Sequence, residues 1–155
     1  MSVIESLMKT QLIGAAVGET VASVTNRMVE NEIGALLVRD GDQLKGIFSE
    51  RDLLQRVVGE GRDPAATNVE DVMTAKVATV EASAPLKQVL EVFRTERIRH
   101  VPITENGVPV GILSTRDFLT FLVEGLERYI EEVSYNDNIA EGSDPYDHIG
   151  GSYGR

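Results

Sequence analysis

Apolar residues recur at three- and four-residue steps in two stretches of the chain, one beginning at residue 21 and the other at residue 86. This spacing places the apolar side chains on one face of an amphipathic helix. Pro85 stands just before the second stretch, and proline is favoured near the first turn of a helix. The pattern therefore predicts two equivalent helices. Their apolar positions are Val21, Val24 and Met28 in the first helix and Leu86, Val89, Leu90 and Phe93 in the second.

Each predicted helix is followed by two short runs that are rich in β-branched and apolar residues. The runs are separated by Gly41 and Asp42 in the first case and by Asn106 and Gly107 in the second. These residue types are typical of tight turns, so each pair of runs predicts a β-hairpin. The second strand of each hairpin then leads directly into another helical pattern. The strands are expected over 35–40, 45–49, 100–105 and 110–114, and the helices that follow them over 51–58 and 116–133.

The chain consists of one unit that occurs twice. When the sequence is shifted by 65 residues without a gap, residues 4–57 align with residues 69–122. Since neither unit can bury both faces of its small sheet, we expect the two units to cover each other's sheets. The predicted fold class is α/β (α+β), with two pseudo-twofold-related units, each a small sheet with flanking helices. The identical pairs in the best-matched segment include Gly46 and Gly111, Ile47 and Ile112, Ser49 and Ser114, Arg51 and Arg116, and Asp52 and Asp117.

The repeat divides the chain into a first domain over residues 1–60, a linker over 61–67 and a second domain over 68–133. The linker region contains Gly, Pro and small residues, which are typical of a connection between units. An acidic, Gly- and Ser-rich tail follows over 134–155. We expect this segment to be mobile, and we expect its His148 to have no functional role.

The composition excludes several classes of protein. The chain has no cysteine, which rules out disulfides, thiolate metal sites and a cysteine nucleophile. Its formal net charge of -10 disfavours binding to nucleic acid. We find neither a secretory signal pattern nor an apolar run long enough to span a membrane, so we expect a cytoplasmic protein that does not bind membranes.

The doubled Ser-x-Arg-Asp segment lies at the predicted junction between a strand and a helix. Ser49 with Asp52 and Ser114 with Asp117 have the spacing of a capping box, so one interpretation is structural. The other interpretation is a ligand site. A helix start can receive an anion, the Asp carboxylate can accept hydrogen bonds from ribose hydroxyls, and the neighbouring arginine can reach a phosphate. These arginines are Arg51 and Arg116.

Two copies of this segment, each after a hairpin, together with DVMTAKVATV at 71–80 and RIRHVPIT at 97–104, resemble paired cystathionine-β-synthase (CBS) domains, often called a Bateman module. The resemblance covers about residues 4–122. It implies a regulatory module with clefts between the units for AMP, ADP, ATP or S-adenosylmethionine, with no obligatory cofactor and no metal. By position, it implies ligand contacts from Ser49, Arg51, Asp52, Val77, Ala78, Thr79, Arg99, His100, Ser114, Arg116 and Asp117.

The two units differ where a phosphate is expected to bind. The first unit has Gly34 and Ala35 where the second has Arg99 and His100. We therefore expect two unequal clefts, with the better anion site served by Arg99 and His100. The other cleft could be empty or could draw its basic groups from the other repeat, and His100 could instead be a plain strand residue with one satisfied hydrogen bond.

Other function classes remain to be weighed. The chain contains none of the common sequence motifs for nucleotide hydrolysis or nucleophilic catalysis, so we do not expect an enzyme. The alternative to ligand binding is a module with degenerate clefts that serves only dimerisation and protein interaction. A homodimer through the long helices is expected, because these helices carry more apolar residues than one chain can cover. The residues are Leu53, Leu54, Val57, Phe118, Phe121 and Leu122.

Overall fold

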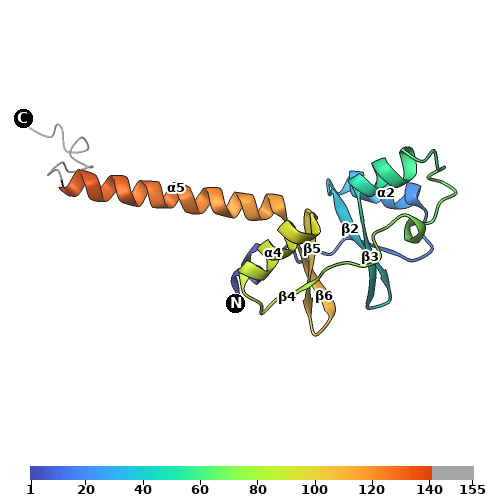
Figure 1. The fold of residues 1–155 in the computed structure, drawn as a ribbon, viewed down its shortest axis with the longest axis horizontal. Coiled ribbons are helices and arrows are strands. Elements are labelled where there is room, and N and C mark those ends of the chain that lie inside the picture. The colour runs from blue at the N-terminus through green and yellow to red at the C-terminus, as the bar shows by residue number, and fades with distance from the viewer. Residues whose placement is uncertain (141–155) are drawn as a thin grey trace, which may run out of the picture. The chain divides into compact units, whose positions relative to one another are not determined.

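The computed structural model describes residues 1–140. It contains two compact units, which are residues 1–117 and the part of the chain that begins at Phe118. The first unit holds two small sheets with their helices, and the second consists of most of one long helix (Figure 1). His148 and the greater part of the expected tail lie outside the described residues.

The first sheet confirms the first predicted hairpin. Its strands are β1 (Gly14–Ala16), β2 (Ala35–Asp40) and β3 (Gln43–Ser49), in the order β1-β2-β3. Strand β1 runs parallel to β2, and β3 is antiparallel to β2. Helix α2 (Val21–Glu30) connects β1 to β2 and packs its apolar face into the core, as its spacing predicts.

The second sheet repeats the first. Its strands are β4 (Val80–Glu81), β5 (His100–Glu105) and β6 (Val108–Ser114), again with a parallel pair and then an antiparallel pair. Helix α4 (Leu86–Glu96) is the equivalent of α2. The hairpins even share an irregularity, because the register shifts after Val38 in one and after its counterpart Ile103 in the other. The fold is therefore a mixed α/β arrangement of two similar three-stranded sheets.

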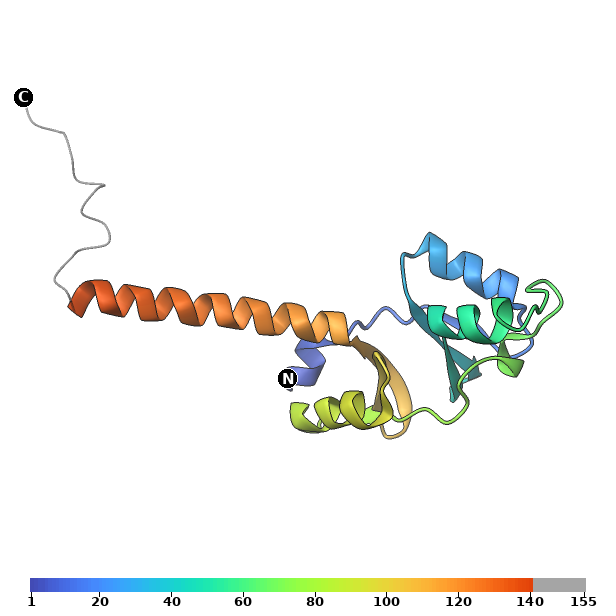
Figure 2. The same ribbon diagram turned by 45° about the horizontal axis from the view of Figure 1, so that its top comes forward.

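The two repeats exchange the segments that lead into them. The short helix α1 (Val3–Leu7) begins the first repeat, but its Ile4 is fully buried in the core of the second. Conversely, Val69 and Val72 belong to the second repeat and are buried in the core of the first. Figure 2 shows α1, in dark blue, beside the helix and sheet of the second repeat. Each core is therefore completed by residues from the segment that begins the other repeat.

The exchanged segments explain the repeated glycines. The backbone of Thr74 pairs with Ile47 of β3, and the backbone of Lys9 pairs with Ile112 of β6. A Cβ added to Gly46 would lie 2.5 Å from the sulfur of Met73 and 2.7 Å from the carbonyl oxygen of Thr74. Gly111 has the same relation to a methionine, Met8. These positions are glycine because the lead-in of the other repeat passes directly over them.

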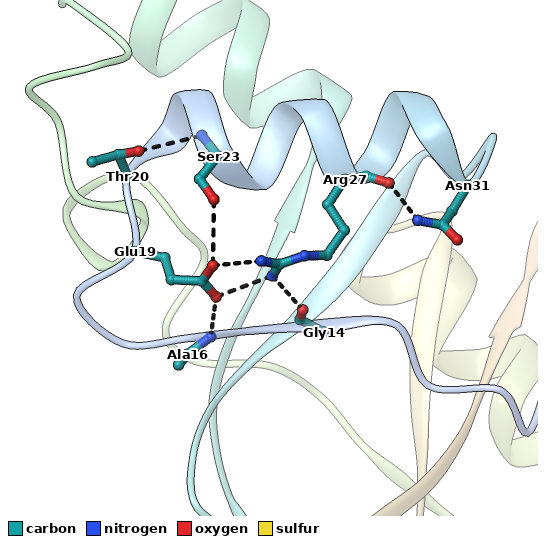
Figure 3. A network of polar contacts seen from close by, with 7 residues as sticks. All are labelled: Gly14, Ala16, Glu19, Thr20, Ser23, Arg27 and Asn31. Carbon is teal, nitrogen blue, oxygen red and sulfur yellow. Dashed lines mark hydrogen bonds and ion pairs between the residues drawn. The ribbon is translucent and has the colours of Figure 1, made fainter.

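One polar network is present in the first repeat alone. The Arg27 guanidinium on α2 binds both carboxylate oxygens of Glu19, at 2.5 and 3.0 Å, and donates to the Gly14 carbonyl at 2.7 Å (Figure 3). Glu19 also accepts a hydrogen bond from the backbone N–H of Ala16. This network fastens α2 to β1. In the second repeat, an alanine and a valine occupy the positions of Glu19 and Arg27.

The segment after β3 is helical over its whole length. It comprises α3 (Glu50–Asp52) and a wider π-helical turn, η1 (Leu53–Val58). Val57 is fully buried in the first core and Leu53 packs against that core, so these two residues are not part of an exposed apolar surface as we had expected. The neighbouring Leu54 and Val58 are exposed.

Helix α5 (Thr115–Ala140) extends past the expected end at residue 133. The first seven residues of the expected tail are therefore helical in the structure, not mobile loop. Apolar side chains remain exposed along this helix, including Leu119, Leu122 and Leu126. Within the described residues, no helix is both long enough and apolar enough to cross a membrane.

Candidate functional site

The Ser-x-Arg-Asp segments form real capping boxes. At the start of α3, the backbone N–H and the hydroxyl of Ser49 both donate to Oδ2 of Asp52, at 2.9 and 3.0 Å, and the Asp52 N–H donates back to the hydroxyl. Ser114 and Asp117 make the same three contacts at the start of α5. The structural interpretation of the motif is therefore confirmed. Each serine hydroxyl donates its proton to the aspartate of its own cap.

The cap uses only one oxygen of each carboxylate. Oδ1 of Asp52 faces the Arg56 guanidinium at 3.5 Å, and Oδ1 of Asp117 faces the Lys9 ammonium at 3.4 Å. Both separations are longer than a good charge-assisted hydrogen bond. Each Oδ1 thus keeps acceptor capacity that a hydroxyl of a ligand could use.

Asp117 is held in its ionised form. Partial burial raises its pKa, but the hydrogen bonds from Ser114 and the charge of Lys9 outweigh burial, so the pKa lies below the usual aspartate range. A carboxylate that stays ionised is a strong acceptor for hydroxyl groups.

The Asp52 cleft has a volume of about 370 Å³ and combines both repeats. The first repeat supplies Ser49, Arg51 and Asp52, and the second supplies Val77 and Ala78. Its size falls within the range of small-molecule sites, which runs from about 300 to 1,000 Å³. Thr79, expected beside Ala78, is not among the residues that line it. Further lining residues are Gly34, Ile47, Glu50, Gln55, Arg56, Thr74, Lys76, Glu96, Arg97, Ile98, Arg99 and His100.

The Asp117 cleft is smaller, at about 210 Å³. It brings Ser114, Arg116 and Asp117 of the second repeat against the end of α2 and the start of β2 in the first. Lys9, from the exchanged lead-in, also lines it. The other lining residues are Glu32, Ile33, Gly34, Ala35, Glu50, Arg99, His100, Ile112 and Thr115.

Arg99 and His100 line both clefts. We had expected them to serve one cleft and distinguish it from the other, and the structure differs from that expectation. Burial, and next the charge of Arg99, lower the pKa of His100, which favours a neutral imidazole at neutral pH. A difference in anion affinity between the two clefts therefore requires residues other than Arg99 and His100.

Several cleft residues were not found from the sequence. Lys9, Glu32, Arg56, Lys76 and Arg97 carry charges into the clefts but lie outside the motif. These residues reach the clefts because the repeats exchange the segments that lead into them and because the two sheets approach each other. The spacing of residues along the sequence does not reveal either feature. Among residues 1–140, no group of three or more His, Asp or Glu side chains is placed to hold a metal ion.

Comparisons with known proteins agree with this geometry. The model of the CBS domain matches residues 4–59 and 69–124. The mitochondrial CBS domain-containing protein CBSX3 of Arabidopsis thaliana is 32% identical over 110 residues, which are 68% of this chain and 53% of that protein. The chain thus spans about half the length of this relative.

Solved structures share the fold. A protein with CBS domains from Burkholderia ambifaria is 33% identical and superimposes with a TM-score of 0.74, covering 80% of this chain and 95% of that one. The CBS domain pair of protein MJ0100, solved with 5′-methylthioadenosine and S-adenosyl-L-methionine, is 19% identical with a TM-score of 0.70 over 77% of this chain and 98% of that chain. At this identity the second likeness supports the fold alone.

Proposed function

Because the chain belongs to the CBS domain family, we propose that it is a regulatory module that binds an adenosyl ligand in its two clefts and catalyses no reaction itself. The candidate ligands are AMP, ADP, ATP and S-adenosylmethionine. The observation that carries the proposal is the placement of Asp52 and Asp117, which line the clefts with one oxygen bound in a cap and the other beside a cation that lines the same cleft.

The cleft chemistry suits a nucleoside. The Oδ1 atoms of Asp52 and Asp117 would accept from the ribose hydroxyls, displacing the weak contacts to Arg56 and Lys9. Val77 and Ala78 give the Asp52 cleft a half-buried apolar wall against which a purine could pack. Ser49 and Ser114 act as positioning residues, since their hydroxyl protons are already bound to the aspartates.

The arginines complete the site. Arg51 and Arg99 line the Asp52 cleft and Arg116 lines the Asp117 cleft, and we propose that they bind the phosphate of a nucleotide. A guanidinium can bind two phosphate oxygens at once, which makes arginine well suited to this contact. A helix cap alone needs no arginine, and this weighs against clefts that have lost their ligand.

A ligand panel tests the proposal. Purified protein would be titrated calorimetrically with AMP, ADP, ATP, adenosine, S-adenosylmethionine and 5′-methylthioadenosine, with the guanine and cytosine nucleotides as controls. We expect saturable binding of at least one adenosyl compound and recovery of that compound intact after long incubation. No saturable binding of any of them would overturn the proposal in favour of a degenerate module, and steady conversion of the ligand would overturn the non-catalytic assignment.

We also propose that a second copy of this chain covers the exposed apolar helices. Leu54 and Val58 of η1 are 64% and 62% exposed, and their repeat equivalents Leu119 and Val123 are 60% and 47% exposed. The same apolar pair recurs in both repeats, so each chain offers two exposed apolar helix faces that an identical partner could cover with its own equivalent faces. Sedimentation equilibrium should give the mass of a dimer at micromolar concentration. The mass of a monomer at that concentration would refute the proposal that a second copy covers these helices.

A further inference from the structure

The two clefts carry opposite charges at one equivalent position. Arg97 ends α4 and lines the Asp52 cleft, whereas Glu32, its counterpart in the repeat, follows α2 and lines the Asp117 cleft. Both residues have a positive φ of 53°, a conformation that glycine or asparagine adopts more easily. The left-handed residue lies at the C-terminal end of the helix in both repeats, so the backbone is the same while the charge that lines the cleft is reversed.

The whole charge balance of the clefts differs in the same direction. Five Lys and Arg residues and three carboxylates line the Asp52 cleft, which leaves an excess of positive charge. Three Lys and Arg residues and three carboxylates line the Asp117 cleft, so its formal charges balance. The larger volume and the positive excess therefore belong to the same cleft.

Besides Arg51, which contacts the Arg97 carbonyl, three cations of the Asp52 cleft have no carboxylate partner within the described residues. The side chains of Lys76, Arg97 and Arg99 are exposed and take part in no ion pair, whereas Lys9 of the other cleft is bound to Asp117. Of the three, Lys76 and Arg97 line the Asp52 cleft alone. These two side chains can turn to a ligand without giving up an existing salt bridge.

From these observations we infer that the clefts sort ligands by charge. The Asp52 cleft takes a nucleoside diphosphate or triphosphate, whose phosphates lie among Lys76, Arg97 and Arg99. The Asp117 cleft rejects such a chain of phosphates because Glu32 repels it, and instead takes a nucleoside compound with little net negative charge. This inference rests on the proposed function and assigns a different ligand class to each cleft.

A charge reversal at the equivalent positions tests the inference. The variant Arg97→Glu gives the Asp52 cleft the residue that the other repeat already holds at the same φ, so it is expected to fold. The matched control is Glu32→Gln in the other cleft. Binding of ATP and of adenosine would be measured by calorimetry at 50 and 200 mM NaCl, with Asp52→Asn and Asp117→Asn used to assign each heat to its cleft.

We expect ATP to bind the Asp52 cleft at least about tenfold more weakly in Arg97→Glu, with adenosine affinity changed less than about threefold. The salt dependence of ATP binding should also become shallower, because fewer charges meet the phosphates. Glu32→Gln should leave ATP binding at the Asp52 cleft unchanged.

The outcomes separate the two proposals. Failure of every adenosyl compound to bind the unmodified protein would overturn the proposed function itself. If adenosyl compounds bind but ATP binds both clefts equally, or if Arg97→Glu weakens ATP and adenosine to the same degree, the charge sorting is wrong and the proposed function still stands. If Arg97→Glu lowers the melting temperature of the ligand-free protein, Lys76→Gln provides a second test. This variant removes another exposed charge of the same cleft, and the inference requires that it weaken ATP binding on its own.

Discussion

The proposed function gives the two oxygens of Asp52 different roles, one in the helix cap and one in ligand binding, and a pair of substitutions can separate these roles. Asp52→Asn keeps the side-chain shape and one acceptor oxygen, which can stay in the cap with the two groups of Ser49 that now donate to Oδ2 at 2.9 and 3.0 Å. An NH₂ group then replaces Oδ1. Ser49→Ala does the opposite, because it removes the cap hydroxyl and leaves Oδ1 in place.

The magnitudes follow from these contacts. Losing an ionised acceptor for ribose hydroxyls costs about 1.5–3 kcal/mol of binding free energy per hydrogen bond, a loss of about tenfold to hundredfold in affinity. The cap is retained in Asp52→Asn, so its free energy of unfolding should change little. Ser49→Ala should lower the free energy of unfolding by about 1 kcal/mol, the usual cost of losing a serine cap. Ser49→Ala should reduce ligand affinity less than Asp52→Asn does.

The assay pairs calorimetric titration with AMP and urea unfolding of the ligand-free protein, both on Asp52→Asn and Ser49→Ala. To isolate one cleft, the titrations would be repeated with Asp117→Asn in the background. Equal losses of affinity in the two variants would refute the division of labour between the oxygens. Unchanged affinity in Asp52→Asn would mean that Oδ1 does not meet the ligand at all.

Three further predictions concern the fold and the proposed dimer. Gly46→Ala should lower the free energy of unfolding by about 1–3 kcal/mol, because its Cβ would lie 2.7 Å from a backbone carbonyl oxygen. Gly125→Ala, in open space on α5, should raise the free energy of unfolding by up to about 1 kcal/mol, and urea unfolding of both variants measures these changes. Glu19→Gln should lower the melting temperature at neutral pH. The hydrogen bond from Arg27 lowers the pKa of the Glu19 carboxyl in the folded state, so the stability that the ionised carboxylate supplies is lost as the pH falls through this lowered pKa, and the difference between the two proteins should then vanish. A difference that is unchanged in acid would contradict this reasoning. Leu119→Glu should dissociate the proposed dimer in sedimentation experiments, and a persistent dimer would place the interface elsewhere.

The elements that sequence reasoning found are those with a long periodic signal. Helices α2 and α4 and both hairpins have enough residues for the three-to-four and two-residue spacings to show, and the turns at Gly41 and Asn106 lie where expected. Strands β1 and β4 have three and two residues, too few for any spacing to be recognised. The end of α5 was placed too early because residues 134–140 are mostly polar. Polarity does not end a helix, and the first helix-breaking residue after 133 is Gly142.

The exchange of lead-ins could not be predicted from the repeat. Ile4 and Val69 are equivalent apolar residues, so either can fill either core without changing the hydrophobic pattern. The choice depends on chain length and on contacts between distant segments. For the same reason the sequence identified the capping residues of the candidate site but missed Lys9, Lys76 and Arg97.

The repeats have kept the residues that the fold needs, and they differ at some of the other residues that line the clefts. Gly46 and Gly111 are retained because a crossing chain leaves no room for a side chain, and the Ser and Asp pairs are retained because each caps a helix. The position of Glu32 and Arg97 has no such constraint on its side chain, since both charges are exposed on the same backbone conformation. A substitution there can change the charge of a cleft without changing a core or a cap. The charge sorting that we infer therefore requires no change in the pseudo-twofold architecture.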